Sequence, residues 1–321
     1  MHIDIIEDTQ RKKWINTTGL NNIFPGHSLD YSKFIKINSG LKSYLLTFNN
    51  EKEVFFCPVH ISNYKGYKCL KNISGYTGFN IDIRSKEIND LQNLLSNKKI
   101  LTFYFTNNPH IKNQISTNNH YKSFKNYAYV IDLNNKLDLL EEKFERNIKK
   151  NIRLINELKI KIMPVNKIDF NRFYYLYLQT CKRLKINPES FYKKKALGYL
   201  IKKYNNKIII TAEINNEIIS TSIFIFEDAH ADYLLNFSID NYNFCTGPII
   251  KKAMKLLKEL GIRNLNLGGG INRDDGLERF KKSFNSNVIK INSYKIISNE
   301  LQYKNFSLPF KNNFFPPFLD D

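Results

Sequence analysis

The residues best suited to chemistry lie around a glycine-rich turn in the C-terminal part of the chain. Gly268, Gly269 and Gly270 end an alternating, strand-like run, and Phe280 and Lys281 follow at helical spacing after an aspartate pair that can cap a helix. Glycine lets the backbone approach a ligand closely, so Gly269 and Gly270 are predicted to contact substrate. A lysine ammonium in a partly dry site can stabilise an oxyanion or hold a phosphate. A plain turn beside buried aromatic rings is the structural alternative.

A second group of candidates lies on a strand expected at residues 229–237. Regular alternation sends His230, Asp232, Leu234 and Asn236 to one face, where an imidazole and a carboxylate can accept a proton from an attacking amine. A structural histidine on a strand is the alternative.

A third candidate is the start of a helix expected at residues 247–260. Thr246 can cap this helix, and Pro248 suits its first turn. Free N–H groups at a helix start bind phosphate, so Cys245, Thr246 and Gly247 are predicted to contact the phosphates of a donor. An ordinary helix start fits the same residues.

Hydrophobic periodicity predicts an α/β chain in which these candidates lie on alternating strands and helices. The first half contains helices near 8–18 and 85–96 and strands near 42–47, 54–61 and 100–106. The second half reads as strands at 127–133, 159–164, 208–214, 217–227, 229–237, 264–267 and 288–297, with helices at 137–157, 169–185, 190–202 and 247–260 and a further helix around Phe280. Asn215-Asn216 is predicted to be a hairpin turn.

Positive charge is concentrated in the middle of the chain. Residues 141–203 hold 17 Lys and Arg against 6 Asp and Glu, a net charge of +11 out of +19 for the whole protein. Such a segment favours a phosphate-rich partner, for example transfer RNA, a nucleotide sugar or coenzyme A. Solvated helix faces are the alternative, because the abundance of Lys, Asn and Ile is also typical of an AT-rich genome.

Composition narrows the class of protein. With 42% hydrophobic residues in 321, the chain is expected to fold into real cores, and its apolar runs are too short to span a membrane. The acidic N-terminus lacks a signal-peptide core, which predicts a cytoplasmic protein. The four cysteines, Cys57, Cys69, Cys181 and Cys245, show no metal-binding or CxxC spacing, so neither a metal site nor a disulfide framework is expected.

The order of these motifs resembles the FemABX family, the peptidyl and aminoacyl transferases of the GNAT superfamily. The match is nearly continuous over residues 127–290 and thin before residue 70. It is carried by the glycine turn with its Phe-Lys helix, and by the segments Gly75-Tyr76-Thr77-Gly78, Tyr127–Leu133, Arg146–Arg153 leading into Ile160–Ile162, and Tyr177, Thr180 and Arg183. Thr77 stands where the family usually has glycine, and no long helical hairpin is inserted, as in the compact members.

The resemblance implies two tandem GNAT-like domains, each a mixed, mostly antiparallel sheet flanked by helices. The expected domains are 1–135, with the tail 299–321 packed on it, and 136–298, which carries the acyl-transfer motifs. In this family the Phe280-Lys281 pair would line the acyl-transfer centre, and Asp240 and Tyr242 would lie beside the acceptor. Further substrate contacts are implied for Tyr76, Arg153 and Arg183.

The expected activity is transfer of an acyl or aminoacyl group to an amine on a cell-envelope or nucleotide-linked sugar or peptide precursor. Acyl-coenzyme A and aminoacyl-tRNA both remain open as donors, and no bound cofactor is expected. One alternative is an acetyl-coenzyme A-dependent N-acetyltransferase acting on a nucleotide sugar or another small amine. Another is a non-catalytic RNA-binding protein that uses only the basic helices.

Overall fold

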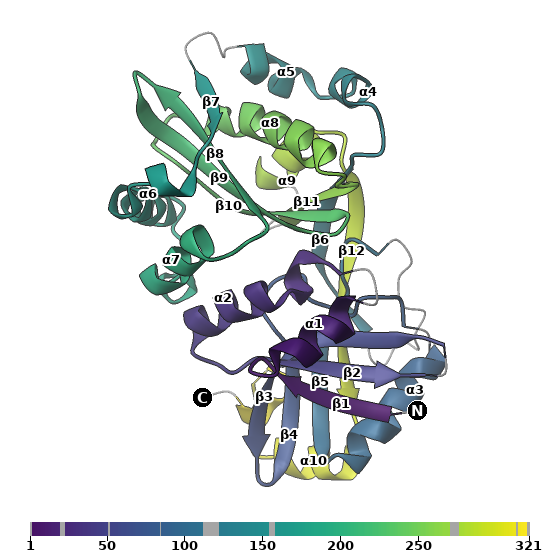
Figure 1. Ribbon diagram of the computed structural model, residues 1–321. Coiled ribbons are helices and arrows are strands. Elements are labelled where there is room, and N and C mark those ends of the chain that lie inside the picture. Colours follow the sequence, from purple (N-terminus) through teal and green to yellow (C-terminus); the bar gives the residue numbers. More distant parts are fainter. Residues whose placement is uncertain are drawn as a thin grey trace. The chain divides into compact units, whose positions relative to one another are not determined.

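The computed structural model divides the chain into two compact units (Figure 1). It describes residues 2–19, 23–50, 52–83, 85–111, 122–153, 158–269, 276–312 and 314–319. Unit 1 comprises Met1–Asn126 and Lys290–Asp321, and unit 2 comprises Tyr127–Ile289. Both unit boundaries therefore lie slightly before the divisions after residues 135 and 298 that the sequence predicts. The tail expected to pack on the first domain belongs to unit 1.

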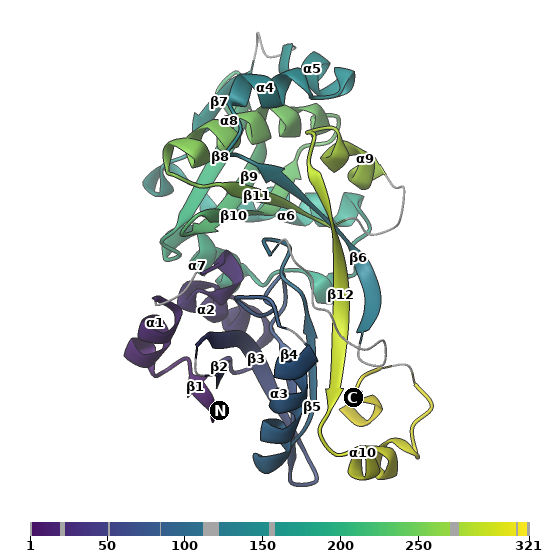
Figure 2. The same ribbon diagram turned by 90° about the vertical axis from the view of Figure 1, so that its right-hand side faces the viewer.

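Unit 1 is built on a mixed, mostly antiparallel sheet with strand order β1-β2-β3-β4-β5-β12. Only β4 and β5 pair in parallel, and Figure 2 shows β12 alongside β5. The strands are β1 (His2–Glu7), β2 (Tyr44–Asn49), β3 (Val54–Tyr64), β4 (Tyr67–Asn72), β5 (Ile100–Thr106) and β12 (Asn287–Ile297). Its helices are α1 (Arg11–Gly19), α2 (Leu29–Ser39), α3 (Ser85–Asn97) and α10 (Glu300–Ser307), with the 3-10 turns η1 (Pro25–His27) and η7 (Pro317–Leu319).

Aromatic rings dominate the packing of unit 1. Phe103, Phe105 and Phe79 pack together in the main core, with ring centroids 4.9 to 5.9 Å apart. The tail packs separately, through Phe318, against Cys69 of β4 and Leu101 of β5. The tail is therefore part of the folded unit.

The strands of unit 2 are also mixed and mostly antiparallel, and they follow the order β6-β11-β10-β9-β8-β7. Again only one pair, β10 and β11, is parallel. The strands are β6 (Lys122–Asp132), β7 (Lys159–Ile162), β8 (Lys207–Ile214), β9 (Glu217–Glu227), β10 (His230–Ser238) and β11 (Asn264–Gly269). The helices are α4 (Leu137–Glu142), α5 (Arg146–Arg153), α6 (Phe170–Arg183), α7 (Lys194–Lys202), α8 (Thr246–Glu259) and α9 (Gly276–Lys282), with the 3-10 turns η4 (Val165–Lys167), η5 (Pro188–Ser190) and η6 (Asn243–Cys245).

Helices cover both faces of the unit 2 sheet, and Figure 1 shows β8, β9 and β10 between α6 and α8. The core lies on the α8 side, where Ile210, Ala231 and Leu265 pack against Ile249 and Leu257 of α8. The predicted hairpin is confirmed: Asn215 and Asn216, with φ of 51° and 64°, join the antiparallel strands β8 and β9. The predicted fold class, α+β with mixed, mostly antiparallel strands flanked by helices in each unit, is also confirmed.

The long basic helix expected at 137–157 is wrong, because the chain breaks into α4 and α5. At the break Phe144 is 3% exposed and packs edge-on against Phe284, with ring centroids 5.3 Å apart. The N–H of the next residue, Glu145, donates to the carbonyl of Ser283. Tertiary burial of Phe144 thus overrides the continuous helical pattern. The sequence also gave no signal for β1, α2, β4 and α10.

Candidate functional site

The parallel strands β10 and β11 pair over only three residues and then separate. His230, Ala231 and Asp232 pair with Asn264, Leu265 and Asn266. Beyond this point β10 stays with β9 as far as Ser238, whereas β11 pairs with β6 at Gly269. We call this divergence the fork: Asp232 and Asn266 form its vertex, and the later parts of β10 and β11 form its two limbs. Several residues predicted from the sequence to form the site lie along it.

The vertex of the fork carries a polar network. Asn266 donates from Nδ2 to Oδ1 of Asp232 at 2.9 Å, and its own Oδ1 accepts from the N–H of Gly268 at 2.9 Å. Ala231, Leu265 and Leu267 point into the α8 core, so the intervening Asp232 and Asn266 face the opposite side of the sheet. Sequence reasoning missed Asn266, although the alternation Asn-Leu-Asn-Leu at 264–267 already marks a polar face.

Lys281 lies on α9 and contacts the end of the β11 limb. Its Nζ donates to the carbonyl of Gly269 at 2.6 Å, and the side chain is buried, with 5% of the residue exposed. Gly268 has φ of 77°, and a Cβ placed there would be 3.4 Å from Nζ of Lys281, so this turn requires glycine next to the ammonium. Hydrogen bonds therefore link Asp232 through Asn266 to Gly268, and Lys281 to the next residue, Gly269. Gly270 and the predicted aspartate cap lie outside the described residues.

Two other predicted residues flank this cluster. Phe280 is half-buried and packs edge-on against Phe284 at a centroid distance of 5.2 Å, which anchors α9 to the core. His230 starts β10, where its Nδ1 lies 3.4 Å from Nδ2 of Asn264. Since an amide nitrogen can only donate, Nδ1 acts as the acceptor and Nε2 carries the ring proton in neutral His230.

A β-bulge at Leu234 reverses the alternation of β10. Tyr233 pairs with Phe224 and Leu235 with the preceding residue, Ile223, so one residue of β10 is extra. After the bulge Asn236 faces α8 and donates to Oγ1 of Thr246 at 3.4 Å. The expectation that Asn236 shares a face with His230 and Asp232 is therefore wrong.

The far end of the β10 limb is held by Arg183. Its guanidinium donates to the carbonyl of Ser238 at 3.1 Å, to the Ser238 hydroxyl at 3.2 Å and to Oδ1 of Asn243 at 3.2 Å. It also lies 3.5 Å from the exposed carboxylate of Asp240. These contacts tie α6 to the turn between β10 and α8. Tyr242, half-buried in this turn, packs against the core. About 20 Å of strand separates Asp232 from Ser238, so Asp240 and Tyr242 do not join the Lys281 cluster.

The start of α8 is closed to solvent. Cys245, Thr246 and Gly247 are all buried, and a Cβ placed at Gly247 would be 3.7 Å from the side chain of Ile148 in α5. The N–H of Thr246 already donates to the carbonyl of Asn243, and Pro248 has no N–H. Burial also raises the pKa of the Cys245 thiol to about 11. A pyrophosphate therefore cannot reach this helix start unless α5 moves.

Tyr76 lies in unit 1, on a loop fixed by close backbone contacts. A Cβ at Gly78 would be 2.0 Å from the carbonyl oxygen of Thr106, the last residue of β5. Thr77 is buried, accepts from Nδ2 of Asn72 at 2.9 Å and donates to the carbonyl of Ile73 at 2.6 Å. This network explains a threonine where the resemblance predicts glycine. Tyr76 itself is half-buried.

The basic segment is partly neutralised by acidic neighbours. Lys161 pairs with Glu213 at 2.7 Å, and Arg172 lies 3.6 Å from Glu217. Arg153, predicted to contact substrate, is exposed at the end of α5.

Within the described residues no cluster of His, Cys, Asp or Glu could hold a metal ion, and all four cysteines are buried free thiols. No described helix is long and apolar enough to span a bilayer.

No protein-family model matches the chain, and no curated protein matches it either. Among solved structures, FemX gives a TM-score of 0.65 at 12% identity, covering 95% of this chain and 99% of FemX. A conserved protein of unknown function from Bacteroides thetaiotaomicron gives 0.63 at 11% identity, covering 92% and 99%. The C-terminal domain (DUF2156) of a putative lysylphosphatidylglycerol synthetase from Agrobacterium fabrum gives 0.54 at 10% identity, covering 92% and 94%.

At these identities the comparisons establish the fold. The chain has the fold of FemX, and at the level of structure this agrees with the predicted resemblance to the FemABX family. Because one fold supports many reactions, the activity has to be argued from the residues of the fork.

Proposed function

We propose that the protein is an acyltransferase that moves an acyl or aminoacyl group to an amine on a cell-envelope or nucleotide-linked sugar or peptide precursor. The fold supports a transferase, because the FemABX proteins that the sequence resembles are peptidyl and aminoacyl transferases and FemX shares the fold. The observation that carries the proposal is the buried ammonium of Lys281 held on the Gly269 carbonyl, at the limb of a fork whose vertex holds a carboxylate.

In the proposed reaction the acceptor amine attacks the carbonyl carbon of the donor, and the carbonyl oxygen gains negative charge. The intermediate then collapses: the bond from the carbonyl carbon to the ribose oxygen of the transfer RNA, or to the sulfur of coenzyme A, breaks, and the proton taken from the amine passes to that leaving atom. The Lys281 ammonium carries three N–H donors, and at least one of them binds Gly269. A second donor from the same ammonium would stabilise the oxyanion, where a fixed positive charge in a partly dry site is most effective. Asp232, oriented by Asn266, would accept the proton that the amine loses, with His230 as the nearby alternative base.

Of the two donors, we favour aminoacyl-tRNA. The buried start of α8 offers few exposed N–H groups to the pyrophosphate of coenzyme A. The net charge of +11 over residues 141–203 suits an RNA backbone. The acceptor is proposed to be phosphate-rich for the same electrostatic reason.

Binding tests separate the donors. The thermal unfolding midpoint is measured with coenzyme A, with charged transfer RNA and with nucleotide sugars, because a ligand that binds only the native state raises the midpoint. A rise with charged transfer RNA is expected. A rise with coenzyme A alone would discard that donor and support the N-acetyltransferase alternative.

Turnover of the donor that binds is then compared in Lys281→Met and Lys282→Met. The two lysines are neighbours on α9, but Lys282 is exposed and pairs with Glu278 at 2.6 Å, which makes its variant the matched control. Transfer should fall at least about a hundredfold in Lys281→Met, the usual cost of losing one oxyanion donor, and should persist in Lys282→Met. Full activity in a folded Lys281→Met would refute the assigned role. Salt-sensitive RNA binding without turnover, unchanged in this variant, would identify a non-catalytic RNA-binding protein.

A further inference from the structure

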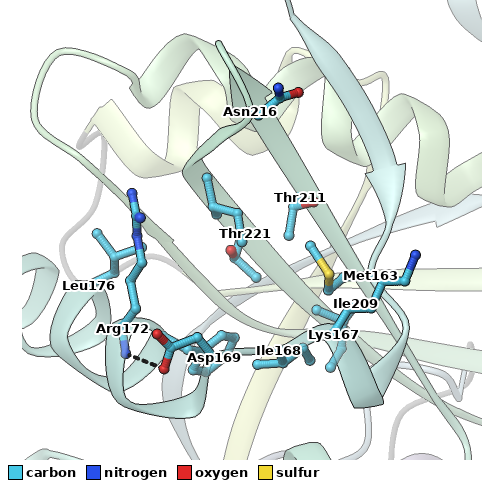
Figure 3. Close-up of a pocket in the computed structure, with 12 residues that line it drawn as sticks. Met163, Lys167, Ile168, Asp169, Arg172, Leu176, Ile209, Thr211, Asn216 and Thr221 are labelled. Atoms are coloured by element: carbon cyan, nitrogen blue, oxygen red, sulfur yellow. Dashed lines mark hydrogen bonds between the residues drawn. The ribbon is translucent and has the colours of Figure 1, made fainter.

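A separate cavity lies in unit 2 on the face of the sheet that α6 covers. Its volume is about 200 Å³, and residues of η4, α6, β8 and β9 line it (Figure 3). None of the residues of the fork belongs to its lining. The opposite, α8 face of the same strands is filled by the main core of the unit. The cavity is thus a feature of one face only.

Two threonines on neighbouring strands line this cavity. Thr211 of β8 and Thr221 of β9 are direct cross-strand partners, so their side chains point to the same face. Each residue is 1% exposed, and neither hydroxyl has a hydrogen-bond partner among the described residues. A buried hydroxyl without a partner is unfavourable, and this cavity has two of them. The pair therefore points to a polar group that binds in the cavity.

Most of the remaining lining is apolar, with the exposed amide of Asn216 and charged side chains at its edge. Ile209 and Phe173 form buried walls, whereas Arg172 and Lys167 are exposed at the mouth, and Figure 3 shows these two cations on either side of the threonines. The carboxylate of Asp169 also lines the cavity, but it accepts the N–H groups of Asn171 and Arg172 as the cap of α6. Glu217 lies 3.6 Å from Arg172 and offsets part of its charge.

We propose that this cavity binds a compact amphiphile with an apolar middle, a hydroxyl group at its deep end and a carboxylate at its outer end. The deep hydroxyl exchanges hydrogen bonds with Thr211 and Thr221, since each hydroxyl can both donate and accept. The carboxylate lies at the mouth between Arg172 and Lys167. A volume of about 200 Å³ equals roughly seven waters of liquid, which suits a molecule of about one substituted aromatic ring.

The probe for this site is 4-hydroxybenzoate, compared with benzoate and with 4-hydroxybenzamide. Titration calorimetry on the full chain should show 4-hydroxybenzoate binding several-fold to about tenfold more tightly than benzoate, the range expected for one net hydrogen bond. It should also bind more tightly than the uncharged 4-hydroxybenzamide.

Isosteric variants test whether the two threonines cause the preference for 4-hydroxybenzoate over benzoate. Thr221→Val and Thr211→Val keep the shape of the side chain and remove an unpartnered hydroxyl, so both should fold at least as well as the natural protein. They should abolish the preference for 4-hydroxybenzoate over benzoate, whereas Thr221→Ser should retain it. Thr47→Val, a buried threonine of unit 1, is the control and should leave the preference unchanged.

The charged end is tested independently. Arg172→Gln should remove the preference for 4-hydroxybenzoate over 4-hydroxybenzamide, and Lys255→Gln, an exposed lysine of α8 with the same change in charge, should not. The proposal is overturned if no probe binds at millimolar concentration, or if the hydroxyl preference survives in the Thr211→Val/Thr221→Val double variant. If only water binds to the two hydroxyls, no probe will bind at millimolar concentration, and the proposal is overturned.

Discussion

Arg183 offers the sharpest test of how the β10 limb is held, because the structure gives its side chain a structural task while the sequence predicts a substrate contact. In Arg183→Met three hydrogen bonds to Ser238 and Asn243 are lost. A hydrogen bond from a charged donor contributes about 1.5–3 kcal/mol, whereas the pair with exposed Asp240 contributes less than about 1 kcal/mol. Because the three bonds share one side chain they are not additive, and the expected loss of unfolding free energy is about 3 kcal/mol.

For a unit of this size the loss corresponds to a fall of about 6–12 °C in the unfolding midpoint. Differential scanning calorimetry measures it, with Lys182→Met, the exposed neighbour on α6, as the control of equal charge change. Arg183→Lys should recover only part of the loss, since an ammonium cannot reproduce the planar guanidinium contacts. The unfolding midpoint of Arg183→Met could instead lie within 2 °C of the control, which corresponds to roughly 1 kcal/mol or less. That result would refute the role of Arg183 in holding the β10 limb, and a substrate contact would become the better explanation.

Two further predictions concern backbone packing and pH. Gly78→Ala should lower the unfolding free energy of unit 1 by about 3 kcal/mol in a denaturant titration, because the new Cβ would lie 2.0 Å from the Thr106 carbonyl. Gly198→Ala lies inside α7, and its Cβ would be 3.5 Å from Phe170, so this variant should raise the unfolding free energy by about 0.5–1 kcal/mol. Equal effects of the two variants would contradict the close contact at Gly78. The pKa of Cys245 is raised to about 11, so its native thiol stays protonated while the unfolded thiol ionises near pH 9. The protonated thiol therefore contributes about 2–3 kcal/mol of unfolding free energy that is complete below pH 9 and is lost as the pH rises towards 11. Between pH 9 and 11 the unfolding free energy of Cys245→Ala should fall less steeply than that of the natural protein. Identical slopes would argue against the raised pKa.

Much of the fold of unit 2 follows from local pattern. Strands β8 and β9 are rich in isoleucine and other β-formers, and the Asn215-Asn216 turn between them tolerates left-handed backbone, so their pairing can be predicted from neighbouring residues alone. Strand β5 was predicted with its observed bounds for the same reason. The glycine turn and Lys281 were also recognisable, because glycine next to a strand end and a lysine at helical spacing are local features.

Other parts of the site depend on contacts that are distant in sequence. The break between α4 and α5 follows from burial of Phe144 against Phe284, and no local pattern records that contact. The bulge at Leu234 sends Asn236 to Thr246 instead of to the face of Asp232, because a single inserted residue reverses every later side chain on the strand. The closed start of α8 is likewise set by α5.

The sequence by itself determined most of the strands and helices of unit 2, the family that they resemble, and the pairing of a glycine turn with a lysine. The tertiary structure decided which of the candidate residues meet. Asp232 and Asn266 meet at the point where β10 and β11 separate, and Lys281 contacts Gly269 at the end of β11, while Asp240, Tyr242 and the start of α8 lie beyond the end of β10. Local periodicity fixes the face of each side chain, but strand register, bulges and packing between distant segments fix its neighbours.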